Sequence, residues 1–177
     1  MKNFWQEVLL LPYISNSQDN PHHEHKVRDL LDLFGYQYVY QPNGTHKSPD
    51  FRVFLPNGKV VEIECKTCKD PQPVYNGGLP KEGVVYIFTS EKYNETTIFF
   101  AEDIIIQPKR KLYKNLIKDL KAVLKSYQLK EEWKNDPRGF DFYIRNMYIQ
   151  KGGEAKTNYF KHADRKRCEQ KVLNYNW

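Results

Sequence analysis

Apolar and polar residues in the first third of the chain alternate at helical and then at strand spacing. Intervals of three or four residues separate the apolar positions of one predicted helix, Val27, Leu30, Leu31 and Phe34. Asn20-Pro21 supplies an N-cap and a first helical residue, and Gly35 supplies a stop. The aromatic and β-branched run 36–41 then predicts a strand. Before this helix, the residues up to Pro12 predict a short amphipathic helix.

Residues 51–66 predict a β-hairpin. Two runs, 51–55 and 59–66, flank the turn Pro56-Asn57-Gly58, in which the proline suits a type I turn and the glycine suits the left-handed residue that follows. This turn pairs Leu55 with Lys59, so that paired residue numbers sum to 114. Asp50 is therefore expected opposite Glu64.

The rest of the chain predicts further strands and helices. Residues 69–81 are irregular, 83–90 and 96–101 read as strands, and 140–149 reads as another strand. A helix over 109–128 has an apolar face and a lysine-rich face, and a basic helix is expected over 159–175. The order of elements predicts an α/β (α+β) fold with one mixed sheet, and the length predicts a single domain over residues 1–177.

Composition narrows the class of protein. The chain has 177 residues, of which 40% are hydrophobic, so a packed core is expected. No apolar run approaches the ~20 residues of a membrane helix. Glu7 interrupts the apolar start and no small-residue cleavage site follows, so we expect no signal peptide and a cytoplasmic address. Cys65 and Cys68 form one C-x-x-C, which is a weak zinc signal; Cys65 reads better as a small buried side chain.

Charge is distributed unevenly along the chain. Residues 1–100 hold 10 Lys and Arg against 12 Asp and Glu, whereas residues 101–177 hold 18 against 10, within a net charge of +6. The second half would attract a polyanion and the first half could hold a metal ion. A solvated basic surface is the alternative explanation.

The predicted hairpin also brings charged residues together. Alternation along the strand places Glu62, Glu64 and Lys66 on one face, beside Asp50 from the partner strand. Two adjacent carboxylates repel each other unless a cation or a proton lies between them, and Mg²⁺ prefers such oxygen ligands. The alternative is an exposed cross-strand charge cluster in which Lys66 neutralises Glu64.

These residues carry a family resemblance. Ser48-Pro49-Asp50, thirteen further residues and then Glu64-Cys65-Lys66 resemble the motif of the PD-(D/E)XK nuclease superfamily. The resemblance covers roughly residues 20–100. It implies a restriction-endonuclease-like fold, a mixed central sheet flanked by helices, in which 20–100 form the catalytic core and about 105–177 supply basic DNA-recognition elements.

The resemblance also implies an activity. Asp50, Glu64 and the backbone carbonyl of Cys65 would ligate Mg²⁺, for which Mn²⁺ would substitute, and Lys66 would position or deprotonate the attacking water. The product ends would be 5′-phosphate and 3′-hydroxyl. A short basic chain of this kind is most similar to a type II restriction endonuclease, which implies a homodimer acting on double-stranded DNA without a nucleotide cofactor.

Other residues are candidates for the same site or its substrate. Many members of the family place a glutamate on the helix before the sheet, and Glu24 fits this position; alternatively, it only favours the positive end of the helix dipole. The loop after the catalytic strand and the basic C-terminal region offer DNA contacts. The candidates are Tyr75, Asn76, Gly77, Gly78, Lys151, Lys156, Arg165, Lys166 and Arg167. For any single loop residue, a structural turn is the alternative.

Two rival functions use the same features. A Holliday-junction or repair nuclease would share Asp50, Glu64 and Lys66 but would prefer branched or damaged DNA. A non-catalytic DNA-binding module or subunit would bind without cleaving. The complete triad favours an enzyme, since a module without activity would have no need to keep it.

Overall fold

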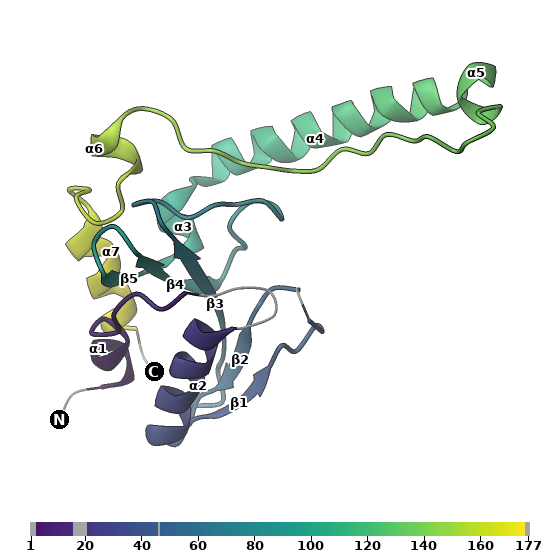
Figure 1. Ribbon diagram of the computed structural model, residues 1–177. Coiled ribbons are helices and arrows are strands. Elements are labelled where there is room, and N and C mark those ends of the chain that lie inside the picture. The colour runs from purple at the N-terminus through teal and green to yellow at the C-terminus, as the bar shows by residue number, and fades with distance from the viewer. Residues whose placement is uncertain (1–2, 16–20, 46, 176–177) are drawn as a thin grey trace.

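The computed structural model describes residues 3–15, 21–45 and 47–175. Within these ranges the chain forms seven helices and five strands (Figure 1). The elements, in chain order, are α1 (Phe4–Val8), α2 (His22–Leu33), β1 (Gln37–Tyr40), β2 (Phe51–Phe54), β3 (Val60–Cys68), β4 (Val84–Ser90), β5 (Glu95–Phe100), α3 (Ala101–Ile104), α4 (Gln107–Gln128), α5 (Glu131–Lys134), α6 (Glu154–Thr157) and α7 (Arg165–Leu173). The mixed α+β class expected from the sequence is confirmed.

The strands form one mixed sheet in the order β1-β2-β3-β4-β5. Among the paired strands, only β3 and β4 run parallel, because the irregular segment 69–83 returns the chain to the end of the sheet at which β3 begins. The β2–β3 hairpin has the predicted register: Phe51 pairs with Ile63 and Val53 with Val61. The Leu55 N–H donates to the Lys59 carbonyl at 2.9 Å, and Gly58 adopts φ +79° in the turn.

Helix α2 lies where the apolar periodicity predicts it. Val27 and Leu31 are fully buried, and the helix ends before Gly35, whose φ of +71° an L-residue rarely adopts. The N-cap residue is Pro21, which makes no side-chain cap; the predicted N-cap, Asn20, lies outside the described residues. The helix packs on β1 and β3.

Two apolar clusters hold the two faces of the sheet. The first joins α1, α2 and α7 to one face through Phe4, Trp5, Val8, Val27, Leu31, Phe51, Val53, Leu55, Val61, Ile63, Cys65, Val85, Ile87, Ile98 and Val172. The second covers β4 and β5 on the other face through Tyr75, Val84, Tyr86, Phe88, Phe99, Ala101, Tyr159 and Phe160. As predicted, Cys65 is a buried free thiol.

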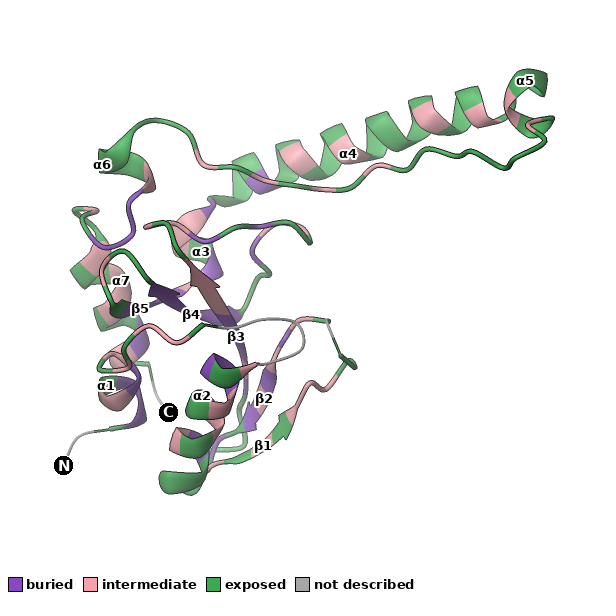
Figure 2. Cartoon of the chain, viewed as in Figure 1, coloured by how far each residue is buried: buried purple, intermediate pink, exposed green. Residues whose placement is uncertain are grey.

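Helix α4 does not pack on the sheet. Together with the returning segment 135–150 it projects from the body as an arm (Figure 1), and most of its surface is exposed (Figure 2). The predicted strand over Phe140–Ile149 is wrong. This segment is extended, but within the described chain its backbone pairs with other strands only at the bridge between Tyr148 and Tyr75. The segment has the residue pattern of a strand, but among the described residues no neighbouring strand pairs with it along its length.

The C-terminal helix is shorter than predicted. α7 begins at Arg165, whereas residues 159–164 form an irregular turn. The Asn158 side-chain oxygen accepts hydrogen bonds from the N–H groups of Phe160 and Lys161, and Tyr159 and Phe160 both insert into the second cluster. Within the ranges described above, no helix combines the length and apolar character needed to cross a membrane.

Candidate active site

Asp50 is held against β3 at the position that the hairpin register predicts. Its backbone N–H donates to the Ile63 carbonyl at 3.0 Å, which continues the β2–β3 ladder by one residue. Its Oδ2 accepts a hydrogen bond from the Cys65 backbone N–H at 2.6 Å. Both bonds fix the Asp50 carboxylate beside Glu64 on the neighbouring strand.

Glu64 and Lys66 lie on the same face of β3 and form a close ion pair. Lys66 Nζ is 2.6 Å from Glu64 Oε1. Glu64 is only 6% exposed, and its second oxygen, Oε2, is buried with no hydrogen-bond partner among the residues that the structure describes. Because buried carboxylate oxygens are normally paired, a cationic ligand would satisfy this oxygen.

The Asp50 carboxyl group lies in an excess of negative charge. Burial raises the pKa of Asp50 to about 8, and the nearby charges of Glu64 and Glu24 act in the same direction. The Cys65 N–H and the Lys66 ammonium oppose this shift without cancelling it. Near neutral pH the carboxylate cluster therefore favours either a proton or a cation.

Lys66 is a cation in this environment. Burial alone would lower its pKa, but the Glu64 carboxylate and its hydrogen bond, with Asp50, raise the pKa above its ordinary value. A lysine that holds its proton this firmly can donate hydrogen bonds and neutralise charge, but it is a poor general base. Of its two expected roles, the raised pKa favours positioning of water.

Glu24 lies near this cluster, close enough for its charge to act on Asp50. It is buried at the start of α2, and its Oε2 accepts a hydrogen bond from the Tyr40 hydroxyl at 2.7 Å. Burial and this bond to Glu24 raise the pKa of Tyr40. The expected proximity to Asp50 is present, since Glu24 contributes to the Asp50 pKa. Tyr40 is thus a hydrogen-bond partner of this buried glutamate.

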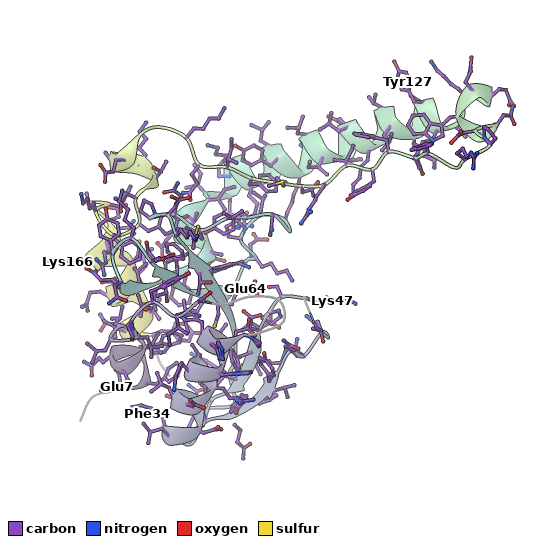
Figure 3. All side chains as sticks on the ribbon, viewed as in Figure 1. Glu7, Phe34, Lys47, Glu64, Tyr127 and Lys166 are labelled. Atoms are coloured by element: carbon purple, nitrogen blue, oxygen red, sulfur yellow. The ribbon has the colours of Figure 1, made fainter. Side chains whose placement is uncertain are left out.

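A cleft of about 450 Å³ opens over Glu64 and Lys66. Its walls are the loop after β1 and the loop after β3, and the four predicted loop residues, Tyr75, Asn76, Gly77 and Gly78, all line it. Lys47 and Lys81 contribute positive charge, and Lys81 Nζ donates to the Ser48 carbonyl at 2.8 Å, which joins the two walls. Figure 3 shows Glu64 at the middle of the molecule and Lys47 on the loop after β1.

The predicted basic residues of the C-terminal region are spread over other surfaces. Lys151 and Lys156 line a separate hollow of about 180 Å³, which shares Tyr75 with the cleft. On α7, Arg165 pairs with Glu95 and Glu169, each at 2.8 Å, and Arg167 pairs with Asp164 at 2.8 Å. Lys166 is exposed on α7, well away from Glu64 (Figure 3). These three residues of α7 are not brought to the cleft.

Three residues near the site were not identified from the sequence. Tyr40 holds Glu24, Lys81 joins the walls of the cleft, and Tyr86 lines the cleft beside its β3 partner Glu64. Lys81 and Tyr86 flank the start of β4, and the parallel β3–β4 pairing brings this start to the site. Tyr40 ends β1 opposite Phe51, one position from Asp50. The order of the strands in the sheet brings these residues to the site, and a single sequence does not reveal that order.

The donor set fits a hard divalent cation. Within the described ranges there is no group of three or more His, Cys, Asp or Glu side chains that would by itself enclose a metal. Mg²⁺ does not require one, because it is often bound by one or two carboxylates and completes its shell with water and substrate phosphate. Asp50 and the unpaired Oε2 of Glu64 meet this requirement.

Comparisons of the chain with protein-family models, with curated proteins and with solved structures found no match.

Proposed function

We propose that this chain is a Mg²⁺-dependent DNA endonuclease of the PD-(D/E)XK type with a restriction-endonuclease-like fold. One observation carries the proposal: the partly buried Asp50 lies beside the buried Glu64, Lys66 is on the same strand face, and Glu64 Oε2 has no hydrogen-bond partner among the described residues. Most buried carboxylate oxygens have a hydrogen-bond partner, and a bound cation would give Glu64 Oε2 one.

The cleft supports a nucleic-acid substrate. Lys47, Lys66 and Lys81 surround it with positive charge, and Gly77 and Gly78 allow a backbone to approach closely. The more basic second half of the chain adds long-range attraction for a polyanion. Double-stranded DNA is the substrate we assign.

The residues of the site divide the work of phosphodiester hydrolysis. Asp50 and Glu64 would hold Mg²⁺, together with the Cys65 carbonyl. The ion would supply positive charge that stabilises the charge developing on the phosphoryl oxygens. Lys66, as a protonated amine, orients the attacking water in line with the leaving 3′-oxygen. Water is added across the P–O3′ bond: its oxygen bonds to phosphorus to give the 5′-phosphate, and its proton, exchanged through solvent, ends on the departing 3′-oxygen as a hydroxyl.

Sequencing of cut ends tests the reaction and the finer assignment to type II restriction. Plasmid and genomic DNA are incubated with the protein and Mg²⁺, and the ends are mapped. Discrete ends within one palindromic sequence, with 5′-phosphates, are expected. Cuts confined to branched DNA would instead favour the junction-resolving or repair enzyme, and DNA binding without cleavage would favour the non-catalytic module.

A matched set of variants separates this site from contaminating nuclease. Asp50→Asn and Lys66→Gln should abolish the cuts, whereas Glu62→Gln should retain them. Glu62 is on the same strand face, but its carboxylate pairs with Arg52 at 2.8 Å. Unchanged cleavage by Asp50→Asn would refute the assignment.

A further inference from the structure

The arm formed by α4 and the returning segment 135–150 exposes more apolar surface than a solvated helix needs. Five apolar side chains of α4 are 42–65% exposed: Leu112, Leu116, Leu120, Val123 and Tyr127. Five more on the returning segment are 59–82% exposed: Phe140, Phe142, Tyr143, Met147 and Ile149. Scattered single apolar residues are ordinary on a surface, but ten on one projection are not.

The exposed residues of α4 form a single stripe. At roughly 100° per residue, the five fall within about 80° of one another around the helix. A second stripe contacts the returning segment; in it, the rings of Tyr113 and Tyr148 meet at 5.4 Å. The exposed stripe is thus not the side of α4 that the arm itself covers.

Charge on α4 is arranged so that two copies of the stripe can meet. Five of its six lysines lie about 180° from the centre of the stripe, at the helical positions of Lys111, Lys114, Lys118, Lys121 and Lys125. The sixth, Lys109, lies on the stripe side in the first turn of the helix, where its Nζ is 5.8 Å from the centre of the Tyr113 ring. Two α4 helices packed stripe to stripe over the rest of their length would keep the five lysines apart, as an interface between identical surfaces requires.

The returning segment has unpaired backbone as well as exposed side chains. It is fastened near the body by the Tyr148 N–H, which donates to the Tyr75 carbonyl at 2.9 Å. Toward the tip, the Asp141 carboxylate accepts bonds from Gln128 and Trp133. Between these points, within the described chain, the backbone of 143–147 makes no hydrogen bond. An extended segment in this state is a ready template for another strand.

The exposed area is large enough for a stable interface. At roughly 200 Å² per large side chain, ten that are on average more than half exposed present on the order of 1,000 Å². Each partner of a standard interface contributes about 800 Å². We infer that the arm is a self-association surface, on which a second copy of this chain packs the same stripe and the same extended segment about a two-fold axis.

This inference does not depend on the nuclease activity, so it is tested without DNA and in EDTA. Sedimentation equilibrium of the full chain should give a mass of two 21.2 kDa chains at micromolar concentration. The double substitution Leu116→Asp with Val123→Asp places charge in the contact, and we expect it to raise the dimer dissociation constant roughly 100-fold or more.

Two controls distinguish the arm from general surface effects. Leu33→Asp changes a leucine on α2 that is more exposed than either substituted residue of the arm, and Lys118→Asp changes the lysine face of α4. Both should remain dimeric. Hydrogen exchange supplies a separate readout: the amides of 143–147 should be protected in the dimer and should exchange freely in the double variant.

Three results would overturn the inference. They are a wild-type chain that stays monomeric at every concentration tested, a dimer that survives the double substitution, and protection of the arm that arises only when DNA is added to a monomer. The last would identify nucleic acid as the occupant.

Discussion

The β2–β3 hairpin and the α4 arm present apolar and charged residues in equally regular patterns, but with opposite results. In the hairpin, Val61, Ile63 and Cys65 are buried under α1, α2 and α7, and the alternate residues form the candidate site. In the arm, the apolar stripe of α4 faces outward and 143–147 lacks a partner strand. A residue pattern determines which element forms, but the rest of the fold decides whether that element is covered.

The hairpin and the arm also differ in what each of them lacks. In the hairpin, one buried oxygen of Glu64 has no hydrogen-bond partner among the described residues, and a small cation would satisfy it. The arm lacks apolar cover over a long surface, which only a macromolecule would supply. We therefore assign chemistry to the hairpin and association to the arm.

Truncation of one large apolar side chain in each region gives the largest difference in stability. Phe51→Ala removes a fully buried ring from the core and should lower the free energy of unfolding by about 3–5 kcal/mol. Leu116→Ala on the arm should change it by less than about 0.5 kcal/mol. Urea denaturation at a concentration low enough to keep the chain monomeric provides the comparison. Similar losses for the two variants would mean that the arm packs on the body.

The buried histidine of α2, His23, provides a test through the pH dependence of stability. Burial lowers the pKa of His23 to about 4, so the unfolded chain, with a value near 6.5, takes up the proton first. The free energy of unfolding should therefore fall by about 3 kcal/mol because of His23 as the pH drops from 6.5 to 4. Above pH 6.5 this contribution is fully present.

Denaturation at a series of pH values measures this effect. His23→Gln should flatten the pH dependence by one proton relative to the wild type. Equal slopes for His23→Gln and the wild type would show that His23 is accessible to water.

Asp50→Asn should stabilise the metal-free protein. Because burial and the nearby carboxylates raise the pKa of Asp50 to about 8, its contribution to stability is present at low pH and is lost as the pH rises toward 8. Asparagine keeps an oxygen for the Cys65 N–H and removes the charge. We expect a gain of about 1–2 kcal/mol in EDTA at pH 8.

With metal bound, the wild type should become more stable than Asp50→Asn. Mg²⁺ or Mn²⁺ is expected to raise the melting temperature of the wild type and to leave that of Asp50→Asn nearly unchanged. Melting curves with and without metal give the comparison. Lower stability of Asp50→Asn in EDTA would show that the Asp50 carboxylate has a structural role.

The smallest effect is expected at the other ion pair of the hairpin. Arg52 and Glu62 lie 2.8 Å apart on the strand face that carries the site, but both are partly exposed. A double-mutant cycle should give a coupling energy below about 1 kcal/mol. A larger value would mean that this end of the hairpin, like the site, is shielded from water.

The sequence predicts the part of the site that depends on local rules. The turn at Pro56-Asn57-Gly58 fixes the register, the register places Asp50 opposite Glu64, and alternation places Lys66 beside them. The loop 72–80 follows the same strand, so its position at the cleft also follows from chain order.

The rest depends on how distant elements pack. The contact between Tyr40 and Glu24 requires α2 to lie across β1, and the bond from Lys81 to Ser48 requires β4 to run parallel to β3. Segment 140–149 has the pattern of a strand, but strand pairing needs a second segment that this chain does not place beside it. No periodicity within one segment carries this information.

The rate of Mg²⁺-dependent DNA cleavage by wild type, Asp50→Asn and Glu62→Gln tests the central assignment most directly. The three proteins are compared on one duplex that contains a mapped cut site, with enzyme in excess. We expect Asp50→Asn to lose at least about 10³-fold in rate and Glu62→Gln to stay within about threefold of the wild type. Equal rates for wild type and Asp50→Asn, or no cleavage of any DNA by the wild type, would contradict the account.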